Sequence, residues 1–382
     1  MIAAGMGSLA AAYGARMHAA LPPELARQPA ELPSGTRESA ELVALEGKLP
    51  LIKRSYRPPN LETPLQHFRG PITPNRAFFV RYHHAVIPEL DAREWRLTVG
   101  GEAASKEASF SLEDLKRRFP HAETTAICLC SGNRRGMFEP HVPGIQWGPG
   151  AMGNAKWGGV RLRDVLNAVG VRKEALEVAF DGADSALLGG PDFVKSIPVW
   201  KALEEDALIA FAMNDEPLPH WNGSPARLVV PGWTATYWVK HLLRIDVLAK
   251  PSTSFWMKTG YRIPANRFPI VERFVSQEGG GTTPITEIAV NSLIVEPAHG
   301  ARVSAGGELE VAGLAWDGGA GIARVEYSRD GGRSWMAAEL GNDLGRFSFR
   351  PWRFGVTHRA RGPIDLQVRA TSRSGVSQPQ EL

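Results

Sequence analysis

The 382-residue chain has only two cysteines, Cys128 and Cys130, and no marked excess of charge of either sign. A C-x-C pair cannot cross-link a chain of this length, so a disulfide-stabilised scaffold is excluded. The 44 lysines and arginines nearly balance the 40 aspartates and glutamates, and no long basic run occurs. A dedicated nucleic-acid binder is therefore not indicated, whereas the net charge of +4 is compatible with an anionic substrate.

Long apolar runs are also absent, because no stretch reaches the roughly 18 uncharged apolar residues of a membrane helix. Residues 1–15, MIAAGMGSLAAAYGA, come nearest and stop at Arg16. They are typical of the apolar core and small-residue end of a secretory signal, but the expected basic leader is missing, so either Met1 is a mis-assigned start or the segment is an Ala-rich tail. We expect residues 1–20 to be the remnant of an export signal and the protein to be periplasmic, with no membrane span.

Several catalytic motifs are missing from the sequence. No G-x-S-x-G, G-x-x-x-x-G-K-[ST] or H-E-x-x-H occurs, and no convincing G-x-G-x-x-G follows a strand pattern. The sequence therefore gives no support for a serine hydrolase, a P-loop protein, a zincin or a dinucleotide-binding protein. C-x-x-C-H is absent too, so we expect no c-type haem in this chain.

The length predicts two domains, and 40 glycines with 29 prolines predict many turns and few long helices. Residues 21–70 are polar and proline-rich, which indicates an extended N-terminal arm. Residues 71–277 alternate short β-rich runs with short helical patterns and predict an α+β catalytic domain. A glycine-rich hinge follows at 278–284, and evenly spaced strand patterns then predict an immunoglobulin-like β-sandwich over 285–382.

Within the predicted catalytic domain, three segments have a strand pattern and three a helical pattern. The strand patterns are WRLTVGG (95–101), ARLVVPGW (226–233) and LLRIDVLA (242–249). The helical patterns are SLEDLKRRF (111–119), RLRDVLNAVG (161–170) and VWKALEEDALIAFAM (199–213).

Two clusters of candidate functional residues stand out before residue 140. In ICLCSGNRRG (127–136), Arg134 and Arg135 place the thiol of Cys130 in a positive field, which favours a thiolate that attacks or binds a metal. In RAFFVRYHH (76–84), strand alternation puts Arg81 and His83 on one face, where they could bind an oxyanion or a metal. Taken alone, a buried core cysteine explains the first cluster equally well, and a satisfied Arg and His on a sheet edge is the favoured explanation of the second.

Two further clusters follow. In PLPHWNGSPARLVVPGWTATYWVKHL (217–242), Asn222, Arg227 and Lys240 surround a Pro-Gly break, which suits a phosphate and fused-ring ligand but also an ordinary turn with surface cations. In KTGYRIP (258–264), Tyr261 either projects its hydroxyl into a cleft or packs against the domain.

The four clusters in this order resemble the sulfite oxidase family of molybdopterin enzymes, most closely the molybdenum subunit of bacterial periplasmic sulfite dehydrogenases. The shared motifs are FFxRxH, C-x-G-N-R-R, N/HGxPxR running into VVPG, a VK pair and GYR, and the resemblance covers residues 71–382. It implies an α+β molybdopterin-binding domain with the sulfite oxidase fold. It also implies that the following all-β immunoglobulin-like sandwich is a molybdenum-cofactor oxidoreductase dimerisation domain.

The resemblance also implies the site residues. Cys130, and not Cys128, is the molybdenum ligand. The implied catalytic residues are Arg81, His83, Arg135 and Tyr261. The implied cofactor-binding residues are Phe79, Val80, Arg81, Tyr82, His83, Cys130, Asp184, Asn222, Arg227, Trp238, Val239 and Lys240. Asn222 stands where animal and plant members have histidine, so His220 or an asparagine contact replaces that bond.

The implied activity is oxidation of sulfite to sulfate at a molybdenum-molybdopterin centre. Because no haem motif is present, the implied electron acceptor is a separate c-type cytochrome, and the implied assembly is a homodimer or a heterodimer with a haem subunit. A nitrate or methionine-sulfoxide reductase of the same superfamily is the nearest alternative. An inactive binding or structural homologue is the third.

Overall fold

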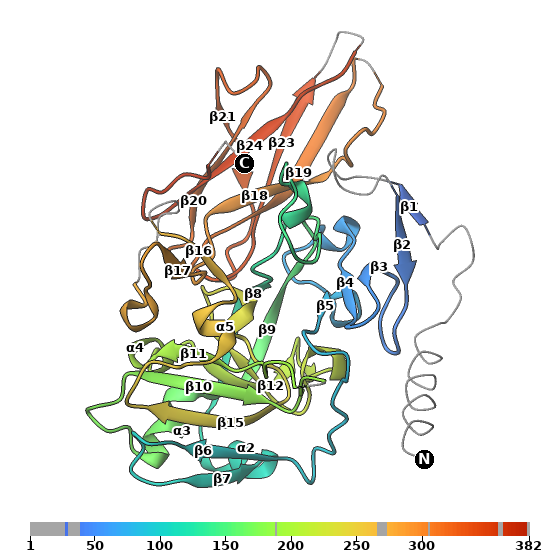
Figure 1. The fold of residues 1–382 in the computed structure, drawn as a ribbon. Coiled ribbons are helices and arrows are strands. Elements are labelled where there is room, and N and C mark those ends of the chain that lie inside the picture. The colour runs from blue at the N-terminus through green and yellow to red at the C-terminus, as the bar shows by residue number, and fades with distance from the viewer. Residues whose placement is uncertain are drawn as a thin grey trace.

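The computed structural model describes residues 27–29, 39–187, 189–265, 273–304, 306–357 and 362–379. Strands dominate these residues, which form a larger unit in the lower part of Figure 1 and a β-sandwich above it. The predicted export signal at 1–20 lies outside the described residues. No helix among the described residues is long and apolar enough to cross a membrane.

An antiparallel sheet at one side of the larger unit contains the first five strands in chain order (Figure 1). They are β1 (Arg27–Pro29), β2 (Ser39–Val43), β3 (Leu51–Ser55), β4 (Asn60–Glu62) and β5 (Val80–Arg81). Leu51 and Leu61 are buried together with Val80, so residues from 39 onward do not form the extended arm predicted for 21–70. Short apolar runs between the prolines bury enough side-chain surface to fold this segment.

Two further sheets form the rest of the larger unit. One has the order β11-β10-β15-β6-β7, in which only β15 and β6 run parallel. Its strands are β6 (Arg96–Gly100), β7 (Ala108–Ser111), β10 (Glu177–Gly182), β11 (Lys195–Pro198) and β15 (Leu242–Leu248). The other has the order β13-β12-β9-β8, with β14 also paired to β12. Its strands are β8 (His121–Leu129), β9 (Met152–Arg161), β12 (Leu208–Met213), β13 (Glu216–Pro217) and β14 (Arg227–Val229).

The helices are short, as the glycine and proline content predicts. They are α2 (Leu112–Arg118), α3 (Leu162–Val169), α4 (Val199–Ala202) and α5 (Phe255–Lys258). Single 3-10 turns are η1 (Leu65–Phe68), η2 (Asn75–Ala77), η3 (Arg135–Met137), η4 (His220–Asn222), η5 (Ala235–Tyr237) and η6 (Val275–Gln277). A capping box begins α2, where Ser111 Oγ accepts from the Asp114 N–H and the Asp114 carboxylate accepts from the Ser111 N–H.

The helical pattern at 199–213 is only partly correct. It splits into the single turn of α4 and strand β12, which lies between β9 and β14. The run LIAFAM has no polar face, so it cannot be assigned to a helix or a buried strand by periodicity alone. The run forms a strand because it pairs with a neighbouring strand on each side in a buried sheet.

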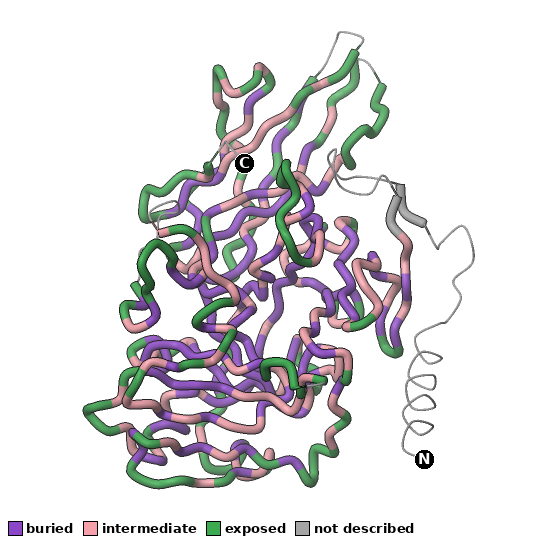
Figure 2. The backbone as a smooth tube through the Cα atoms, in the orientation of Figure 1, coloured by how far each residue is buried: buried purple, intermediate pink, exposed green. Residues whose placement is uncertain are grey.

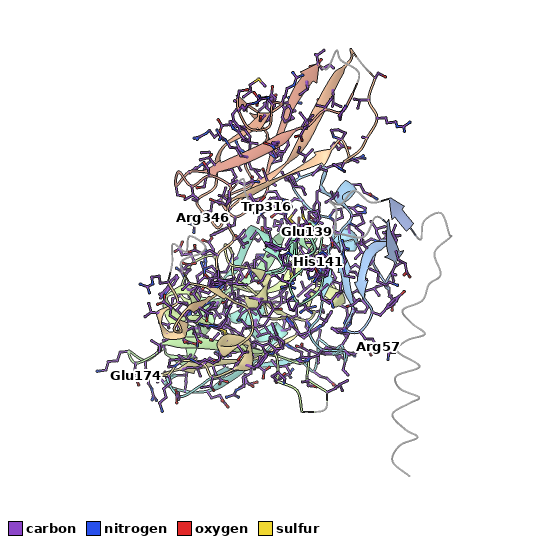
Figure 3. All side chains as sticks on the ribbon, turned by 45° about the horizontal axis from the view of Figure 1, so that its top comes forward. Arg57, Glu139, His141, Glu174, Trp316 and Arg346 are labelled. Atoms are coloured by element: carbon purple, nitrogen blue, oxygen red, sulfur yellow. The ribbon has the colours of Figure 1, made fainter. Side chains whose placement is uncertain are left out.

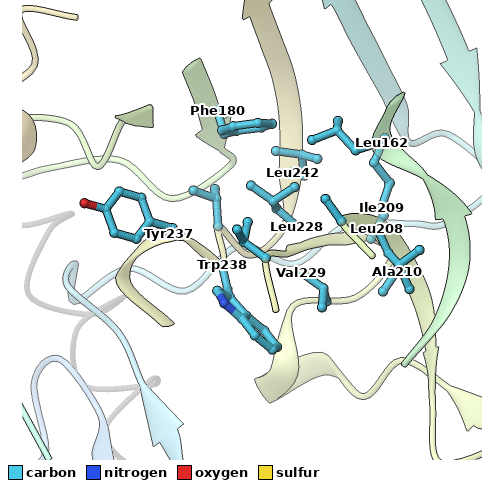
Figure 4. Close-up of a cluster of buried hydrophobic side chains, with 14 of the residues drawn as sticks. Leu162, Phe180, Leu208, Ile209, Ala210, Leu228, Val229, Tyr237, Trp238 and Leu242 are labelled. Atoms are coloured by element: carbon cyan, nitrogen blue, oxygen red, sulfur yellow. The ribbon is translucent and has the colours of Figure 1, made fainter. Parts of the chain in front are cut away.

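The main hydrophobic core lies between the sheets of the larger unit, where the tube in Figure 2 is mostly buried. Figure 4 shows its centre, in which Leu208 and Ile209 of β12 pack near Leu228 of β14 and Leu242 of β15. Trp238 belongs to the same core. The core therefore supports the loop that carries Trp238 and Lys240.

The predicted sandwich is confirmed. One sheet has the order β18-β19-β23-β22 and the other β21-β20-β24. The strands are β18 (Asn291–Glu296), β19 (Glu308–Trp316), β20 (Ile322–Ser328), β21 (Met336–Ala337), β22 (Glu339–Leu340), β23 (Arg350–Thr357) and β24 (Gln367–Ser372). The predicted hinge is not wholly irregular, because its end forms β17 (Thr282–Pro284), which pairs with β16 (Arg262–Pro264).

Candidate active site

A cavity of about 660 Å³, including its open mouth, lies where β5, the end of β8 and the loops around η4 and η5 meet. Aromatic rings and cationic side chains form most of its wall. Its lining residues are Phe78, Phe79, Arg81, Tyr82, His83, Cys128, Cys130, Ser131, Asp184, Phe193, Trp221, Asn222, Arg227, Ala235, Thr236, Trp238, Val239, Lys240 and Tyr261. All four clusters singled out in the sequence thus contribute to one cavity.

Cys130 stands directly after β8, where the chain turns out of the sheet. Its N–H donates to the carbonyl of Ala151, and its Sγ accepts from the N–H of Gly132 at 3.4 Å. Its side chain is 7% exposed, so the sulfur is held in a mostly dry wall of the cavity. A backbone donor on a buried sulfur suits a thiol that acts as a metal ligand.

Arg81 and His83 both reach the hydroxyl of Tyr261, although that residue follows them by about 180 positions. The Arg81 guanidinium donates to the Tyr261 hydroxyl at 3.3 Å, and Nε2 of His83 forms a short hydrogen bond with the same oxygen. β5 ends at Arg81, so His83 lies after the strand, and the two side chains meet at this oxygen without the strand alternation that the sequence pattern predicts. Tyr261 is held at φ +58°, a left-handed conformation that a bulky side chain rarely adopts.

The charges in this triad follow from its burial. Burial lowers the pKa of His83 well below its usual value, and the positive charge of Arg81 acts in the same sense. Burial also raises the pKa of Tyr261. His83 is thus a neutral imidazole and Tyr261 a neutral phenol, beside a permanently charged guanidinium.

Arg134 and Arg135 point to different places. Arg134 donates to Asn291 Oδ1 at 2.7 Å and to the carbonyl of Ser292, both in the sandwich, so it does not supply the positive field predicted around Cys130. Arg135 donates to the carbonyl of Ile145 and is close enough to lower the pKa of Tyr261 electrostatically. Its side chain is not part of the cavity wall itself.

Glycines make the room that Arg135 occupies. A Cβ at Gly132 would lie 2.8 Å from the Arg135 guanidinium, and one at Gly144 would lie 2.5 Å from it. Gly144 also has φ +120°, which excludes most other residues. The C-x-G-N-R-R motif therefore needs its glycine so that the arginine can pass beside the cysteine loop.

Arg227 is buried on the opposite wall. Its guanidinium lies 5.1 Å from the ring of Trp157 and 5.7 Å from that of Trp238, and it donates to the carbonyls of Asn222 and Trp238. It also approaches Cys128 Sγ at 3.9 Å. Burial lowers the pKa of Arg227, but an arginine in this setting still carries its charge.

Lys240 lies over the ring of Tyr82, 2.9 Å from its centroid, and its pKa is lowered well below the usual value by burial. Asp184, whose pKa burial raises, is the carboxylate that interacts with it. Among the described residues, neither Arg81, Arg227 nor Lys240 forms an ion pair. Because arginine keeps its charge when buried, Arg81 and Arg227 give the cavity excess positive charge, which suits an anionic ligand.

Most of the residues expected at the site line the cavity, with Val80 and Arg135 as exceptions. Val80 packs in the core of the N-terminal sheet with Leu51 and Leu61. Lining residues that the sequence does not reveal are Phe78, Cys128, Ser131, Phe193, Trp221, Ala235 and Thr236. Phe193 stacks on His83 at 3.6 Å, and no motif marks it, because its role arises only when its loop folds over β5.

Comparison with known proteins shows to which family this chain is related. Residues 84–256 match the model of the oxidoreductase molybdopterin binding domain, and residues 282–382 match the Mo-co oxidoreductase dimerisation domain. The sulfite oxidase of Gallus gallus is 36% identical over 341 residues, which cover 86% of this chain and 72% of that protein. The chain belongs to the sulfite oxidase family.

One further relative and one solved structure are also similar to this chain. The mitochondrial sulfite oxidase of Mus musculus is 38% identical over 75% of this chain and 52% of its own length, so the chain spans about half of that relative. The crystal structure of the sulfane dehydrogenase SoxCD from Paracoccus pantotrophus superposes with a TM-score of 0.74 at 28% identity. That match covers 94% of this chain and 84% of the other.

The residues of the cavity fit the molybdenum-pterin group that the sulfite oxidase family implies. The hydroxyl of Thr236 is buried in the cavity wall with no partner among the described residues, as expected of a group that awaits a ligand. The cations Arg227 and Lys240 suit the negative charge of a pterin phosphate. Cys130 supplies the soft sulfur donor that the metal requires.

Proposed function

We propose that this protein oxidises sulfite to sulfate at a molybdenum-pterin centre and passes the electrons to a c-type cytochrome. The observation that carries the proposal is the convergence of Arg81, His83 and Tyr261 at one wall of a positively charged cavity that also holds Cys130. When bound, the molybdenum-pterin group supplies oxygen-atom transfer and accepts two electrons. The net reaction takes sulfite and water to sulfate, two protons and two electrons.

The protein holds this group with residues on two sides of the cavity. Cys130 is the proposed metal ligand, and Arg227, Asn222 and Lys240 are the proposed pterin and phosphate contacts. Arg227 is already fixed by two carbonyl acceptors and two indole rings, so its binding costs little side-chain entropy.

The substrate oxyanion binds beside Arg81 in this proposal. Sulfite carries one or two negative charges near neutral pH, and the guanidinium offers it charge-assisted hydrogen bonds. Arg135 adds positive potential from behind the cavity wall. The site thereby selects small oxyanions and disfavours neutral substrates.

Tyr261 holds a proton at its hydroxyl. Arg81 can only donate, so it uses a lone pair of the phenol oxygen and leaves the hydroxyl hydrogen for Nε2 of His83 or for a substrate oxygen. Because His83 is neutral, its Nε2 can accept a hydrogen bond from that hydroxyl. Tyr261 thus orients the oxyanion and connects it to a base.

We place the protein in the periplasm, where c-type cytochromes are available, on the strength of the apolar segment at 1–15. We further propose that the sandwich binds either a second copy of the chain or a haem subunit. The match of residues 282–382 to a dimerisation domain supports an assembly of this kind. Light scattering of the purified protein, with and without the cytochrome, separates the two.

The test is acceptor-dependent turnover of the purified, molybdenum-loaded protein. Sulfite alone should reduce the centre and then stall, added cytochrome c should restore turnover, and molecular oxygen should serve poorly. Rapid oxygen uptake with peroxide release and no cytochrome reduction would exclude the dehydrogenase. Parallel assays with a persulfide, nitrate and methionine sulfoxide test the other activities, and turnover of one of these without sulfite oxidation would replace the proposal.

A further inference from the structure

Lys48 is a buried cation outside the site described so far. It lies in the turn between β2 and β3, is 5% exposed, and its Nζ donates to three acceptors. These are the carbonyl of Asn75 at 2.7 Å, the carbonyl of Phe78 at 3.1 Å and Oδ1 of Asn222 at 2.8 Å. The last bond joins the N-terminal sheet to a residue of the cavity wall that lies 174 positions further along the chain.

This burial is unfavourable for the lysine itself. All three acceptors are neutral, no ion pair to Lys48 occurs among the described residues, and burial lowers its pKa to about 7. An apolar side chain of similar size would avoid that cost. Retention of an ammonium here therefore calls for a role beyond packing.

The bond from Lys48 determines how the amide of Asn222 is oriented. Nζ of Lys48 donates to Oδ1 at 2.8 Å, and the protonated lysine has no acceptor to offer Nδ2. Oδ1 is thereby occupied, and the two Nδ2 hydrogens have no partner among the described residues. Asn222 lines the cavity, whereas His220 does not, so of these two polar side chains the amide is the one that can meet a ligand.

We infer that Lys48 is a positioning residue for the cofactor, because it turns the amide hydrogens of Asn222 toward the phosphate and ring acceptors of a bound molybdenum-pterin group. The turn between β2 and β3 then supports the cofactor site, although it precedes the segment 84–256 that matches the molybdopterin-binding domain. This inference rests on the proposed function only for the identity of the cofactor.

The first variant is Lys48→Met in the full-length protein, made with cofactor supply. Lys53→Met is the matched control, because Lys53 belongs to the same sheet but pairs with Glu41 and lies over the ring of Tyr56, away from the cavity. Molybdenum per chain is measured by mass spectrometry, and released pterin by fluorescence, during extended dialysis. Lys48→Met should lose cofactor about tenfold faster than the wild type, while Lys53→Met should match the wild type.

The second variant, Asn222→Asp, separates positioning from folding. It gives Lys48 a carboxylate partner, so the thermal midpoint of the cofactor-free protein should stay the same or rise, yet it removes the amide donor. Cofactor loss should again be about tenfold faster. If Lys48 has a purely structural role, cofactor retention should instead fall only in variants whose thermal midpoint falls.

Wild-type retention in either Lys48→Met or Asn222→Asp would overturn the inference. If Lys48→Met does not fold, Asn222→Asp decides by itself. None of these readouts uses sulfite, so normal loading without sulfite turnover would refute the proposed function alone. A wild-type chain that never takes up molybdenum would refute both.

Discussion

At the scale of single residues, the two cysteines have different environments because one lies within a strand and the other follows its end. Both line the cavity, but Cys128 lies within β8, paired opposite Gly153, whereas Cys130 follows the end of the strand. Burial raises the pKa of Cys128 to about 11, so it remains a protonated thiol beside Arg227. Only Cys130 has a backbone donor on its sulfur.

Cys130→Ser should therefore give a folded protein with little or no sulfite oxidation, because a protonated hydroxyl is a poor replacement for a thiolate on this metal. Cys128→Ser should reduce activity only mildly. Steady-state turnover and molybdenum content of both variants provide the measurement. Wild-type turnover in Cys130→Ser with molybdenum present would remove this residue from the metal site.

Arg81 allows a second prediction at this scale. Arg81→Met should raise the KM for sulfite by about 10-fold to 150-fold, which corresponds to the roughly 1.5–3 kcal/mol of one hydrogen bond to a charged group. Added salt should raise the KM of the wild type and affect the variant less, since part of the screened attraction is gone. An unchanged KM and salt profile would show that Arg81 is structural.

At the scale of elements, the turn from α5 to β16 decides where Tyr261 stands. Lys195, at the start of β11, donates to the carbonyl of Trp256 at 2.7 Å, and Arg262 donates to that of Met257 at 2.8 Å. The Ile285 N–H donates to the carbonyl of Tyr261 at 2.9 Å. Two residues distant in sequence, Lys195 and Ile285, together with the neighbouring Arg262, thus hold the turn in its left-handed conformation.

Lys195 is fully buried, and burial lowers its pKa to about 7. The unfolded chain, with a lysine pKa near 10.4, therefore binds more protons between about pH 7 and 10, and the free energy of unfolding should rise with pH across that window. Lys195→Met should reduce this rise by roughly 2–4 kcal/mol. Denaturant unfolding at pH 7, 8 and 9 measures it.

Lys201→Met is the control for that experiment. Lys201 is also buried, but its ammonium pairs with the Glu204 carboxylate at 2.6 Å. Its replacement therefore shows what the loss of a buried lysine with an ion-pair partner does to the free energy of unfolding. Identical slopes for the wild type and Lys195→Met would contradict the lowered pKa.

At the scale of the whole molecule, polar contacts join the two units. Arg134 bonds to the start of β18 and lies 5.6 Å from the ring of Trp316, and the Ile127 N–H donates to the carbonyl of Phe347. Figure 3 shows Trp316 and Arg346 where the sandwich meets the larger unit. The loop after Cys130 is thus fixed from the sandwich side.

Arg134→Ala should destabilise the protein by about 2–3 kcal/mol, because it removes two hydrogen bonds that a charged group donates across the interface. Arg346→Ala is the comparison, since Arg346 and Asp206 form an exposed pair worth less than about 1 kcal/mol. Guanidinium denaturation of both variants measures the difference. Equal stabilities would mean that Arg134 contributes no more than a surface ion pair.

Much of the molecule follows from the sequence alone. The glycine and proline content predicts short elements, the period-two pattern predicts β6, β14, β15 and the sandwich, and the capped SLEDLKRRF run predicts α2. Residue type and order bring Cys130, Arg81, Arg227 and Tyr261 together as candidates, since thiolate, guanidinium and phenol are the chemistry that an oxyanion and a soft metal require.

Tertiary structure decided the rest, because burial and direction depend on neighbours that are distant in the chain. Arg134 and Arg135 are adjacent and identical in type, yet one bonds to the sandwich and the other to the carbonyl of Ile145. The LIAFAM run became a strand only because β9 and β14 were there to pair with it. Lys48 carries no local signal, since its partner Asn222 is brought to it by the packing of the N-terminal sheet against the cavity.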